Sequence, residues 1–438
     1  MSKEFITGID IGSSKITTVI VSTDDKQPKV IGVSTNKSSG MKKGVVVDID
    51  DAVKCISESI ESAERMSGVT ITSAILNIGG RQISSTNNHG VIAISKDDIS
   101  KDDVERVIES SRAISVPQTK EILHVIPREF IVDSQDGIRD PIGMSGIRLE
   151  VDTHIITVSS MALHNLIKCV NQVGIAVDSV VFSGLADGEL LLNSTEKELG
   201  VMLIDIGFGI CNVVLYMDDA ITFSSTIPIG SNNITNDIAI GLRLSIEDAE
   251  KVKNNIALLV KKAKISLDKD KQDKKYSPEY SPDGLSDFKS DGDLILKLSD
   301  IGIEVDSGVE DIKKSMLDDI IDARLEEIFN AIKEDIKKSG FDYNMPSGVV
   351  LTGGGAMLDG IGKYAHKYLS SAVRVSHPSN LIGLTDEIST PAYSTVCGLI
   401  DYYLNKNKLN ENSRKKTNVA SFASKGNVFL DWLKTLMP

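Results

Sequence analysis

Two stretches of the chain carry the same pattern of apolar and small residues. Residues 5–21 alternate apolar and small side chains around Gly8, Asp10 and Gly12, which predicts two strands joined by a tight turn. Residues 201–216, VMLIDIGFGICNVVLY, repeat the aspartate, the apolar residue and the glycine after a buried strand. The copies lie about 195 residues apart, which is a domain-sized period. The pattern predicts two related halves that face each other across a cleft.

The segments between and after these copies have other patterns. Residues 84–157 carry their own strand and turn signals and predict a subdomain inserted into the first half. Residues 234–264 and 312–338 have apolar positions three and four apart, which predicts helices. Residues 268–293 are rich in Lys, Asp, Ser and Pro, so we expect a flexible surface loop there.

The end of the chain is a polar, basic linker followed by a short amphipathic pattern. The last residues, NVFLDWLKTLMP, predict a helix with one apolar face and basic residues beside it: Val428, Phe429, Trp432, Leu433, Leu436, Lys425 and Lys434. A terminal helix can also dock on its own protein core. The sole tryptophan, the linker of some twenty residues and the basic residues before the helix instead favour an anionic membrane surface.

Composition narrows the class of protein. A chain of 438 residues exceeds the size of a single core, and its net charge of −14 argues against a nucleic-acid partner. No apolar stretch approaches the roughly 20 residues of a spanning helix, so we expect membrane contact to be peripheral. The cysteines have neither metal-binding nor disulfide spacing, which indicates a reducing cytoplasm: Cys55, Cys169, Cys211 and Cys397.

The two turns have the residue types of a phosphate site. The first turn offers backbone amides, hydroxyls and an ammonium to phosphate oxygens, through Gly12, Ser13, Ser14 and Lys15. Asp10, ahead of that turn, could orient hydrated Mg²⁺. A single such turn could be an ordinary hairpin turn. The second copy, with Asp205, Gly207 and Gly209, favours a clamp on a magnesium triphosphate.

A third glycine-rich element follows another buried strand and consists of Gly353, Gly354 and Gly355. Consecutive glycines let the backbone approach a flat base or sugar closely. A helix-capping turn is the alternative. The chain has no GxxxxGK[ST] motif and this element is not GxGxxG, so P-loop and dinucleotide-binding folds lose support.

In order and spacing, these elements resemble the phosphate 1, phosphate 2 and adenosine motifs of the actin, Hsp70 and hexokinase superfamily. The blocks HVIPREFIVD, GIRDPIGMSGIRLE, KELGVMLIDIG and EDAEKVK narrow the resemblance to the bacterial cell-division FtsA family, over residues 5–404 and the terminal helix. The resemblance implies an α/β, actin-like fold of two halves around a nucleotide cleft, with an FtsA-type inserted subdomain and a C-terminal amphipathic helix. The implied cofactors are ATP and Mg²⁺, with Asp10 and Asp205 holding the metal through water.

The resemblance also assigns further residues to the nucleotide. Glu250 and Lys253 match a glutamate and a lysine that contact the base and ribose, and Gly230 closes a turn on the phosphate side. An exposed charge pair three residues apart on a helix would explain Glu250 and Lys253 nearly as well.

The second turn departs from the family pattern GGGTTD. Ile210 removes a hydroxyl that could touch a phosphate, and Asn212 removes a carboxylate that could position metal or water. We therefore expect ATP binding with slow or absent hydrolysis. His124 and His154 have no metal spacing, so we expect them to serve packing, and Cys211 fits a small buried filler.

The resemblance divides the chain as follows: 1–83 and 158–200, first half (1A); 84–157, inserted subdomain (1C); 201–233 and 341–404, second half (2A); 234–340, helical subdomain (2B); 405–426, linker; 427–438, membrane helix. It implies a peripheral protein on the cytoplasmic face of the membrane at the division site. Its partners would be the FtsZ C-terminal tail on 2B, other division proteins through 1C, and copies of itself in filaments. A pilus-assembly protein like PilM and a small-molecule kinase of the same superfamily remain alternatives.

Overall fold

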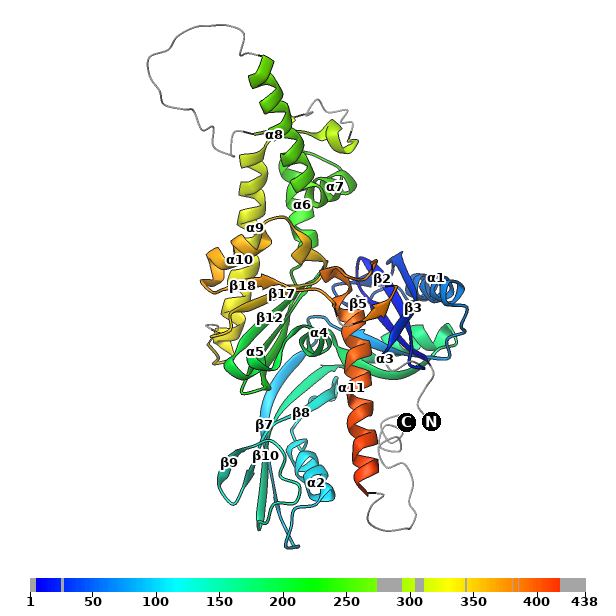
Figure 1. Ribbon diagram of the computed structural model, residues 1–438, viewed down its shortest axis with the longest axis vertical. Coiled ribbons are helices and arrows are strands. Elements are labelled where there is room, and N and C mark those ends of the chain that lie inside the picture. The colour runs from blue at the N-terminus through cyan, green and yellow to red at the C-terminus, as the bar shows by residue number, and fades with distance from the viewer. Residues whose placement is uncertain are drawn as a thin grey trace.

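The computed structural model describes residues 5–24, 27–273, 294–303, 311–342, 345–379, 381–384 and 386–417, without the side chains of 267–273 and 407–417. The predicted membrane helix, 427–438, lies outside the described residues. The described chain is elongated, with the helical subdomain at one end and the inserted subdomain at the other (Figure 1).

Each half is built on a sheet, and the two sheets share one strand order. The first sheet runs β11 (Ala176–Phe182), β6 (Ser73–Ile78), β1 (Phe5–Ile11), β2 (Lys15–Ser22), β3 (Lys29–Lys37), β19 (Ile382–Gly383). The second runs β18 (Val373–Val375), β17 (Val349–Thr352), β12 (Val201–Ile206), β13 (Cys211–Met217), β14 (Ala220–Ile227). In both, two parallel pairings are followed by two antiparallel ones. The shared order confirms the predicted duplication.

Helices cover both faces of the first sheet. On one face lie α1 (Ile49–Ser67) and α3 (Ser160–Gln172), and Thr18 of β2 shares a 2.8 Å hydrogen bond with Ser59 of α1. On the other face α4 (Ser183–Leu191) and α11 (Ser394–Thr417) pack side by side, between the two sheets (Figure 1). The short strands β4 (Met41–Lys42) and β5 (Val45–Val46) complete this half. The helix α5 (Ser194–Leu199) instead lies against β13 of the second sheet, and its Glu196 pairs with Arg374 of β18 at 2.8 Å.

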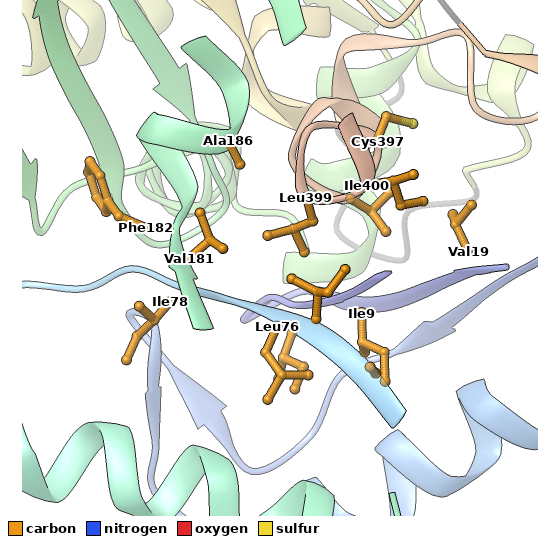
Figure 2. Packing of buried hydrophobic residues seen from close by; sticks show 14 of the residues in the cluster. Ile9, Val19, Leu76, Ile78, Val181, Phe182, Ala186, Cys397, Leu399 and Ile400 are labelled. Atoms are coloured by element: carbon orange, nitrogen blue, oxygen red, sulfur yellow. The ribbon is translucent and has the colours of Figure 1, made fainter. Parts of the chain in front are cut away.

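The end of the predicted second half needs a correction. Residues 341–404 were expected there, but β19 pairs with β3 and the apolar face of α11 packs on the first sheet. Figure 2 shows Leu399 and Ile400 of α11 above Ile9 and Leu76. The chain returns to the first half through β19 and α11, because the first sheet leaves an apolar face that α4 alone does not cover.

The inserted subdomain has its own sheet and core. Its strands follow the order β7 (Ser84–Ala93), β10 (Arg148–Ser159), β8 (Lys120–Val132), β9 (Gln135–Ile138). The helix α2 (Lys101–Ser111) begins at a capping box formed by Ser100 and Asp103. Val107 of this helix packs on Leu149 and Val151 of the sheet, and this confirms the predicted insertion as an element of the fold.

The helical subdomain extends from the second sheet and shares one hydrophobic core with it (Figure 1). Its elements are α6 (Ser231–Leu242), α7 (Ile246–Asn254), α8 (Ile256–Asp273), β15 (Ile295–Lys297), a 3₁₀ turn η3 (Leu298–Ile301), β16 (Asp311–Lys313) and α9 (Lys314–Lys338). Arg243 ends α6 at a φ of 54°, and Ser245 caps α7, so the helical pattern predicted over 234–264 is divided among three helices. The 3₁₀ turns η4 (Gly354–Met357) and η5 (Pro391–Tyr393), and α10 (Ile361–Leu369), follow later in the chain.

Two predicted boundaries were wrong for one reason. Helix α8 continues to Asp273, into the predicted loop 268–293, and α11 continues to Thr417, into the predicted linker 405–426. Both extensions are polar but contain neither glycine nor proline. A helix that has already formed can propagate through lysine, glutamine and asparagine at little cost per residue.

Candidate nucleotide site

The two predicted phosphate turns have the same backbone geometry. In the first, the Gly12 amide donates to the Lys15 carbonyl at 3.0 Å, and in the second the Gly207 amide donates to the Ile210 carbonyl at 2.9 Å. Asp10 therefore occupies in its hairpin the place of Asp205 in the other. A turn closed in this way points its next amides outward, where an anion could bind them.

Two carboxyl groups, one at the base of each turn, lie close enough for the charge of Asp205 to act on Asp10. Burial raises the pKa of Asp10 to about 6, with Lys15 opposing the shift and the charge of Asp205 adding to it. Burial also raises the pKa of Asp205 to about 6, against the hydrogen bond from Asn212. Both groups are ionised at neutral pH, and their mutual repulsion is relieved when a cation is present.

A neighbouring amide holds each of these carboxylates. Asn77, near the end of β6, donates to Asp10 Oδ1 at 2.6 Å and accepts from the Ile11 amide at 2.7 Å. Asn212 donates to Asp205 Oδ2 at 2.8 Å and accepts from the Thr226 hydroxyl at 2.8 Å. Asn77 was missed in the sequence, although a polar residue inside the buried strand AILNI was a usable signal.

A third acid, Asp187 of α4, lies close enough to Asp205 and Asp10 to interact with them electrostatically. Burial, together with the charges of Asp205 and Asp10, raises its pKa well above the usual range. One oxygen accepts from Thr395 at 3.4 Å, and within the described chain the other is buried without a hydrogen-bond partner. The sequence signal was an acid two residues before Glu189 in a mostly apolar run after a strand, FSGLADGELLL.

These donors fit a hydrated divalent cation with a polyphosphate. Oxygen ligands suit Mg²⁺, which keeps much of its water and takes one or two carboxylates. Asp10 and Asp205 would hold that hydration shell, and the orphan oxygen of Asp187 leaves a further acceptor nearby. The metal would neutralise phosphate charge beside the two turns.

The tri-glycine element meets the second turn directly. Gly353 has a φ of +86°, and a Cβ at this position would lie 2.2 Å from Asp205 Oδ1. A Cβ at Gly355 would lie 2.4 Å from the Ile206 side chain, whereas Gly354 has open space to 4.0 Å. Only glycine fits at the first of these positions. The predicted adenosine element thus adjoins the predicted metal ligand.

Gly230 lies under the second turn at the start of α6. A Cβ at this residue would come within 2.5 Å of the Phe208 carbonyl oxygen. The next two amides, of Ser231 and Asn232, donate to the Gly207 and Phe208 carbonyls at 2.9 and 2.8 Å. The turn therefore caps this helix, and those two amides are already engaged.

Glu250 and Lys253 contact each other on α7. The Lys253 ammonium donates to Glu250 at 2.6 Å and to Thr235 of α6 at 2.8 Å, and its side chain is only 7% exposed. Burial alone would raise the pKa of Glu250, but Lys253, Thr235 and Asn254 together hold that pKa below its usual value. The pair joins α7 to α6. Its contact with a nucleotide stays a prediction.

The two departures from the family pattern lie between the halves. Ile210 Cδ1 would be 3.1 Å from a Cβ at Gly79 of the first half, and Asn212 Oδ1 would be 3.3 Å from it. Ile210 stands where the first turn has Lys15, so this side of the site has an apolar group in place of a charge.

Of the residues expected to serve packing, His154 and Cys211 are buried and His124 is partly buried. Burial lowers the pKa of His124 to about 3 and that of His154 to about 3. His124 Nε2 accepts from the Phe182 amide at 3.1 Å, and the His154 ring lies between Asn87 and Ser224 at 2.7 and 2.8 Å. Cys211 is fully buried, and burial raises the pKa of its thiol.

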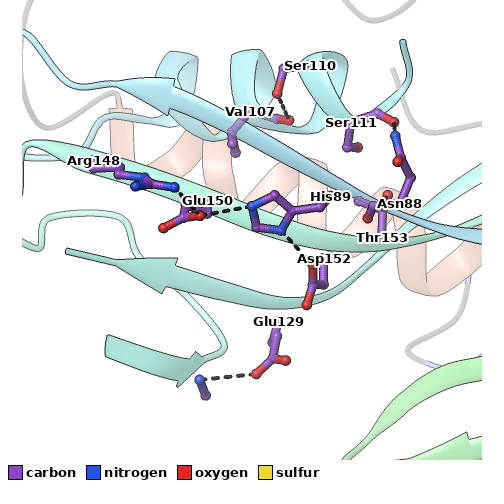
Figure 3. A network of polar contacts seen from close by, with 11 residues as sticks. Asn88, His89, Val107, Ser110, Ser111, Glu129, Arg148, Glu150, Asp152 and Thr153 are labelled. Atoms are coloured by element: carbon purple, nitrogen blue, oxygen red, sulfur yellow. Dashed lines mark hydrogen bonds and ion pairs between the residues drawn. The ribbon is translucent and has the colours of Figure 1, made fainter. Parts of the chain in front are cut away.

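A separate charged cluster lies on the inserted subdomain (Figure 3). The His89 ring bridges Asp152 at 2.8 Å and Glu150 at 2.9 Å, and Arg148 pairs with Glu150 at 2.8 Å. The hydrogen bond to Asp152 is the main reason that the pKa of His89 is raised. The cluster joins β7 to β10 far from the phosphate turns.

Two cavities of about 640 and 500 Å³ lie on the second half, and neither is lined by the phosphate turns. The first lies beside β18 and the start of α10. The second lies between α8, α9 and α10 and combines apolar and charged side chains: Ile256, Val260, Ile321, Lys314, Lys363 and Lys367, with Asp318, Asp319, Asp322 and Asp359. Among the helices of the described chain, none is long and apolar enough to cross a membrane.

The two sheets have the same strand order, and each contains a hairpin whose turn follows an aspartate. The two turns lie beside each other. This arrangement defines the actin-like class of folds. The solved structure of a PilM–PilN type IV pilus biogenesis complex has a TM-score of 0.60 at 13% identity, over 91% of this chain and 98% of that one. An MreB5 of Spiroplasma citri bound to AMPPNP has a TM-score of 0.50 at 12% identity, over 94% and 100%. At such identities the likeness concerns the fold alone.

Sequence similarity narrows the class to one family. Family models described as "SHS2 domain inserted in FTSA" and "Cell division protein FtsA" match residues 80–157 and 202–398. The cell division protein FtsA of Borreliella burgdorferi is 36% identical over 99% of this chain and 100% of its own length. That of Pseudomonas aeruginosa is 34% identical over 92% and 90%. The chain belongs to the FtsA family of cell-division proteins.

Proposed function

We propose that this protein is an ATP-binding adaptor that polymerises and holds FtsZ filaments at the cytoplasmic face of the cell membrane during division. The observation that carries the proposal is the pair of facing acidic turns in a chain of the FtsA family. Within it, we propose that the inserted subdomain, 84–157, recruits other division proteins and that the terminal residues 427–438 bind the membrane.

The nucleotide would lie against both turns, with Mg²⁺ beside Asp10 and Asp205. Phosphate oxygens would contact the first turn and Gly207 and Gly209, and the adenosine would reach the tri-glycine element and α7. Because Ile210 and Asn212 replace polar groups that could position water, turnover should be slow or absent. Phosphate release at ordinary enzyme rates, about 1 per second or faster, would contradict this part of the proposal.

The charged groove between α8, α9 and α10 is the place where we propose that the FtsZ tail docks. Its apolar side chains, Ile256 and Val260, are flanked by ammonium and carboxylate groups of α9 and α10. Such a groove can bury apolar anchors of a peptide while charges at its rim set the orientation. Binding of an FtsZ tail peptide to the full chain, measured by fluorescence anisotropy, tests this assignment.

The terminal helix would bind a bilayer weakly as a monomer. About five large side chains, each worth roughly 1.5–3 kcal/mol when buried, must also offset the ordering of the segment. Filament formation would present many copies at once and multiply the residence time on the membrane. Membrane binding would therefore depend on polymerisation.

Vesicle co-sedimentation tests the membrane part of the proposal. The full chain should pellet with vesicles that contain anionic lipid, and deletion of 427–438 should leave it in the supernatant. Replacement of Trp432 by Glu should have nearly the same effect, because a carboxylate cannot enter the apolar boundary. Equal pelleting of the deletion variant would overturn membrane anchoring by this segment.

The alternatives predict other outcomes. A pilus-assembly role is not favoured, since curated FtsA proteins are 31–36% identical over nearly the whole chain while the PilM–PilN structure is 13% identical. A small-molecule kinase would consume ATP only when its acceptor substrate is added, which a phosphate-transfer screen would reveal.

A further inference from the structure

A small hairpin between β3 and α1 lies beside both phosphate turns. Its tip consists of Lys43 and Gly44, with φ angles of 51° and 75°. The base of the hairpin is closed by the Val47 and Asp48 amides, which donate to the Gly40 carbonyl at 2.8 and 3.1 Å. A left-handed conformation is unfavourable for a lysine relative to glycine, because the Cβ crowds the backbone. The surrounding contacts must compensate for this cost.

Those contacts join the two halves of the molecule. The Gly44 amide donates to the Ser13 hydroxyl of the first turn at 3.0 Å. A Cβ at Gly209 of the second turn would lie 3.3 Å from Lys43 Cα. The Lys43 ammonium reaches further, to the Pro228 carbonyl at 2.9 Å, two residues before Gly230. One exposed lysine therefore contacts the second half while its neighbour contacts the first.

The charge of Lys43 has no carboxylate partner in the hydrogen bonds and ion pairs of the described residues. Its ammonium donates to a neutral carbonyl. The other lysine of the site, Lys15, is placed 3.7 Å above the Tyr393 ring, and burial lowers its pKa while Asp10 opposes that shift. A magnesium triphosphate keeps a net negative charge, so a further ammonium at this point would be strongly favoured by a bound phosphate.

We infer that Lys43 is a phosphate-binding residue of the nucleotide site, carried by the β4–β5 hairpin. When a nucleoside triphosphate binds between the turns, the Lys43 ammonium exchanges the Pro228 carbonyl for phosphate oxygens and holds the hairpin closed over them. The inference rests on the proposed ATP site and adds a residue that bridges the two halves. A purely structural latch is the competing explanation.

Affinity measurements with matched variants separate the two explanations. Lys43→Gly removes the ammonium and relieves the left-handed backbone, so the variant should fold with an unchanged or higher Tm. Its affinity for Mg·ATP should fall roughly 10–100-fold, with adenosine binding unchanged. Lys43→Arg should keep most of the affinity, and Lys42→Gly, on the adjacent exposed strand position, should keep all of it.

Each other outcome has a distinct meaning. Wild-type protein that binds no ATP would overturn the proposed function itself. Wild-type protein that binds ATP, with Lys43→Gly binding it equally well, would overturn only the role of Lys43. A lowered Tm with unchanged selectivity between ATP and adenosine would make Lys43 a structural latch, which also overturns the inference.

Lysine labelling gives a second test on the unaltered protein. With an amine-reactive reagent and mass spectrometry, Mg·ATP should slow modification of Lys43 by at least threefold and leave Lys42 unchanged, while Mg²⁺ with adenosine should protect neither. Equal labelling of Lys43 with and without bound ATP would overturn its contact with phosphate.

Discussion

Asp10 and Asp205 are held at a cost to the stability of the empty protein. Each has a pKa of about 6, against a usual value of 3.8. Because the folded state holds the proton more tightly than the unfolded state, these groups contribute relative stability below the unfolded pKa, and that contribution is lost as pH rises through about 6. At neutral pH, in the absence of nucleotide and metal, the charges of these two carboxylates therefore lower the stability of the folded protein.

Asp205→Asn should stabilise the empty protein and abolish its function. At pH 7.5 the amide removes a buried charge, so we expect the free energy of unfolding in urea to rise by about 1–2 kcal/mol. At pH 5 the gain should shrink, since Asp205 itself is then protonated. Mg·ATP binding should be lost at both pH values. A variant that is less stable at pH 7.5 would contradict the account of this charge.

The positive charge of His89 should stabilise the folded protein, in contrast to the charges of Asp10 and Asp205. Its pKa is raised above 6.5, so the contribution of the bridge to Asp152 and Glu150 is complete below that value and is lost as pH rises through the raised folded pKa. His89→Gln should lower the free energy of unfolding by about 0.2–1 kcal/mol at pH 6, because the ring is partly exposed, and by much less at pH 9. A pH-independent difference between the two proteins would exclude a charged bridge.

At the residue scale, the sequence predicted those site residues that occur in both copies of the repeated pattern. Asp10 and Asp205 could be paired from two copies of one pattern, and the structure gives both the same place in a hairpin. Asn77 and Asp187 have no second copy, and they come to the site only through β6 and α4. Lys43 could not be found from sequence because its position depends on how the two halves meet.

The helix pair α4 and α11 is the element that joins the halves. A Cβ at Gly398 of α11 would lie 2.3 Å from the Ala186 carbonyl oxygen of α4, so the helices cross at backbone contact. Faces of both sheets pack on this pair, since Leu203 and Val350 of the second sheet belong to the same core as Ile9 of the first. A change in the crossing distance would move one half against the other.

Gly398→Ala should therefore separate these helices. We expect a loss of about 1–3 kcal/mol in the free energy of unfolding, as for overpacked cores. Gly362→Ala, in α10, is the matched control, because a Cβ there meets nothing within 4 Å. That change should stabilise the protein by up to about 1 kcal/mol through helix propensity. Equal effects of the two substitutions in urea unfolding would contradict the close crossing.

Elements with strong local patterns were predicted, and those that depend on distant partners were not. The two hairpins and the inserted subdomain follow from alternation and turn residues. The two-residue strand β19 and the packing of α11 on the first half require the finished first sheet, and no local pattern encodes them. Hydrophobic periodicity does not mark the helix ends at Asp273 and Thr417, because both helices continue through polar residues without a glycine or proline.

At the scale of the whole molecule, the inserted subdomain touches both halves. It is inserted in the first half, but it also contacts β14 of the second half. Ser85 donates to the Ser224 carbonyl at 2.6 Å, and Asn87 donates to the Thr222 carbonyl at 3.1 Å. His154 adds a contact to the Ser224 hydroxyl at 2.8 Å. A movement between the halves would therefore also shift the surface that we propose for the recruitment of other division proteins.

Recruitment of FtsZ to a supported bilayer tests the central claim most directly. With Mg·ATP, the full chain should bring fluorescent FtsZ filaments to an anionic bilayer. Deletion of 427–438 should abolish that recruitment, and Asp205→Asn should reduce it severely, since one removes the anchor and the other the nucleotide. FtsZ fluorescence on the bilayer that is as strong with the deletion variant as with the full chain would contradict the account.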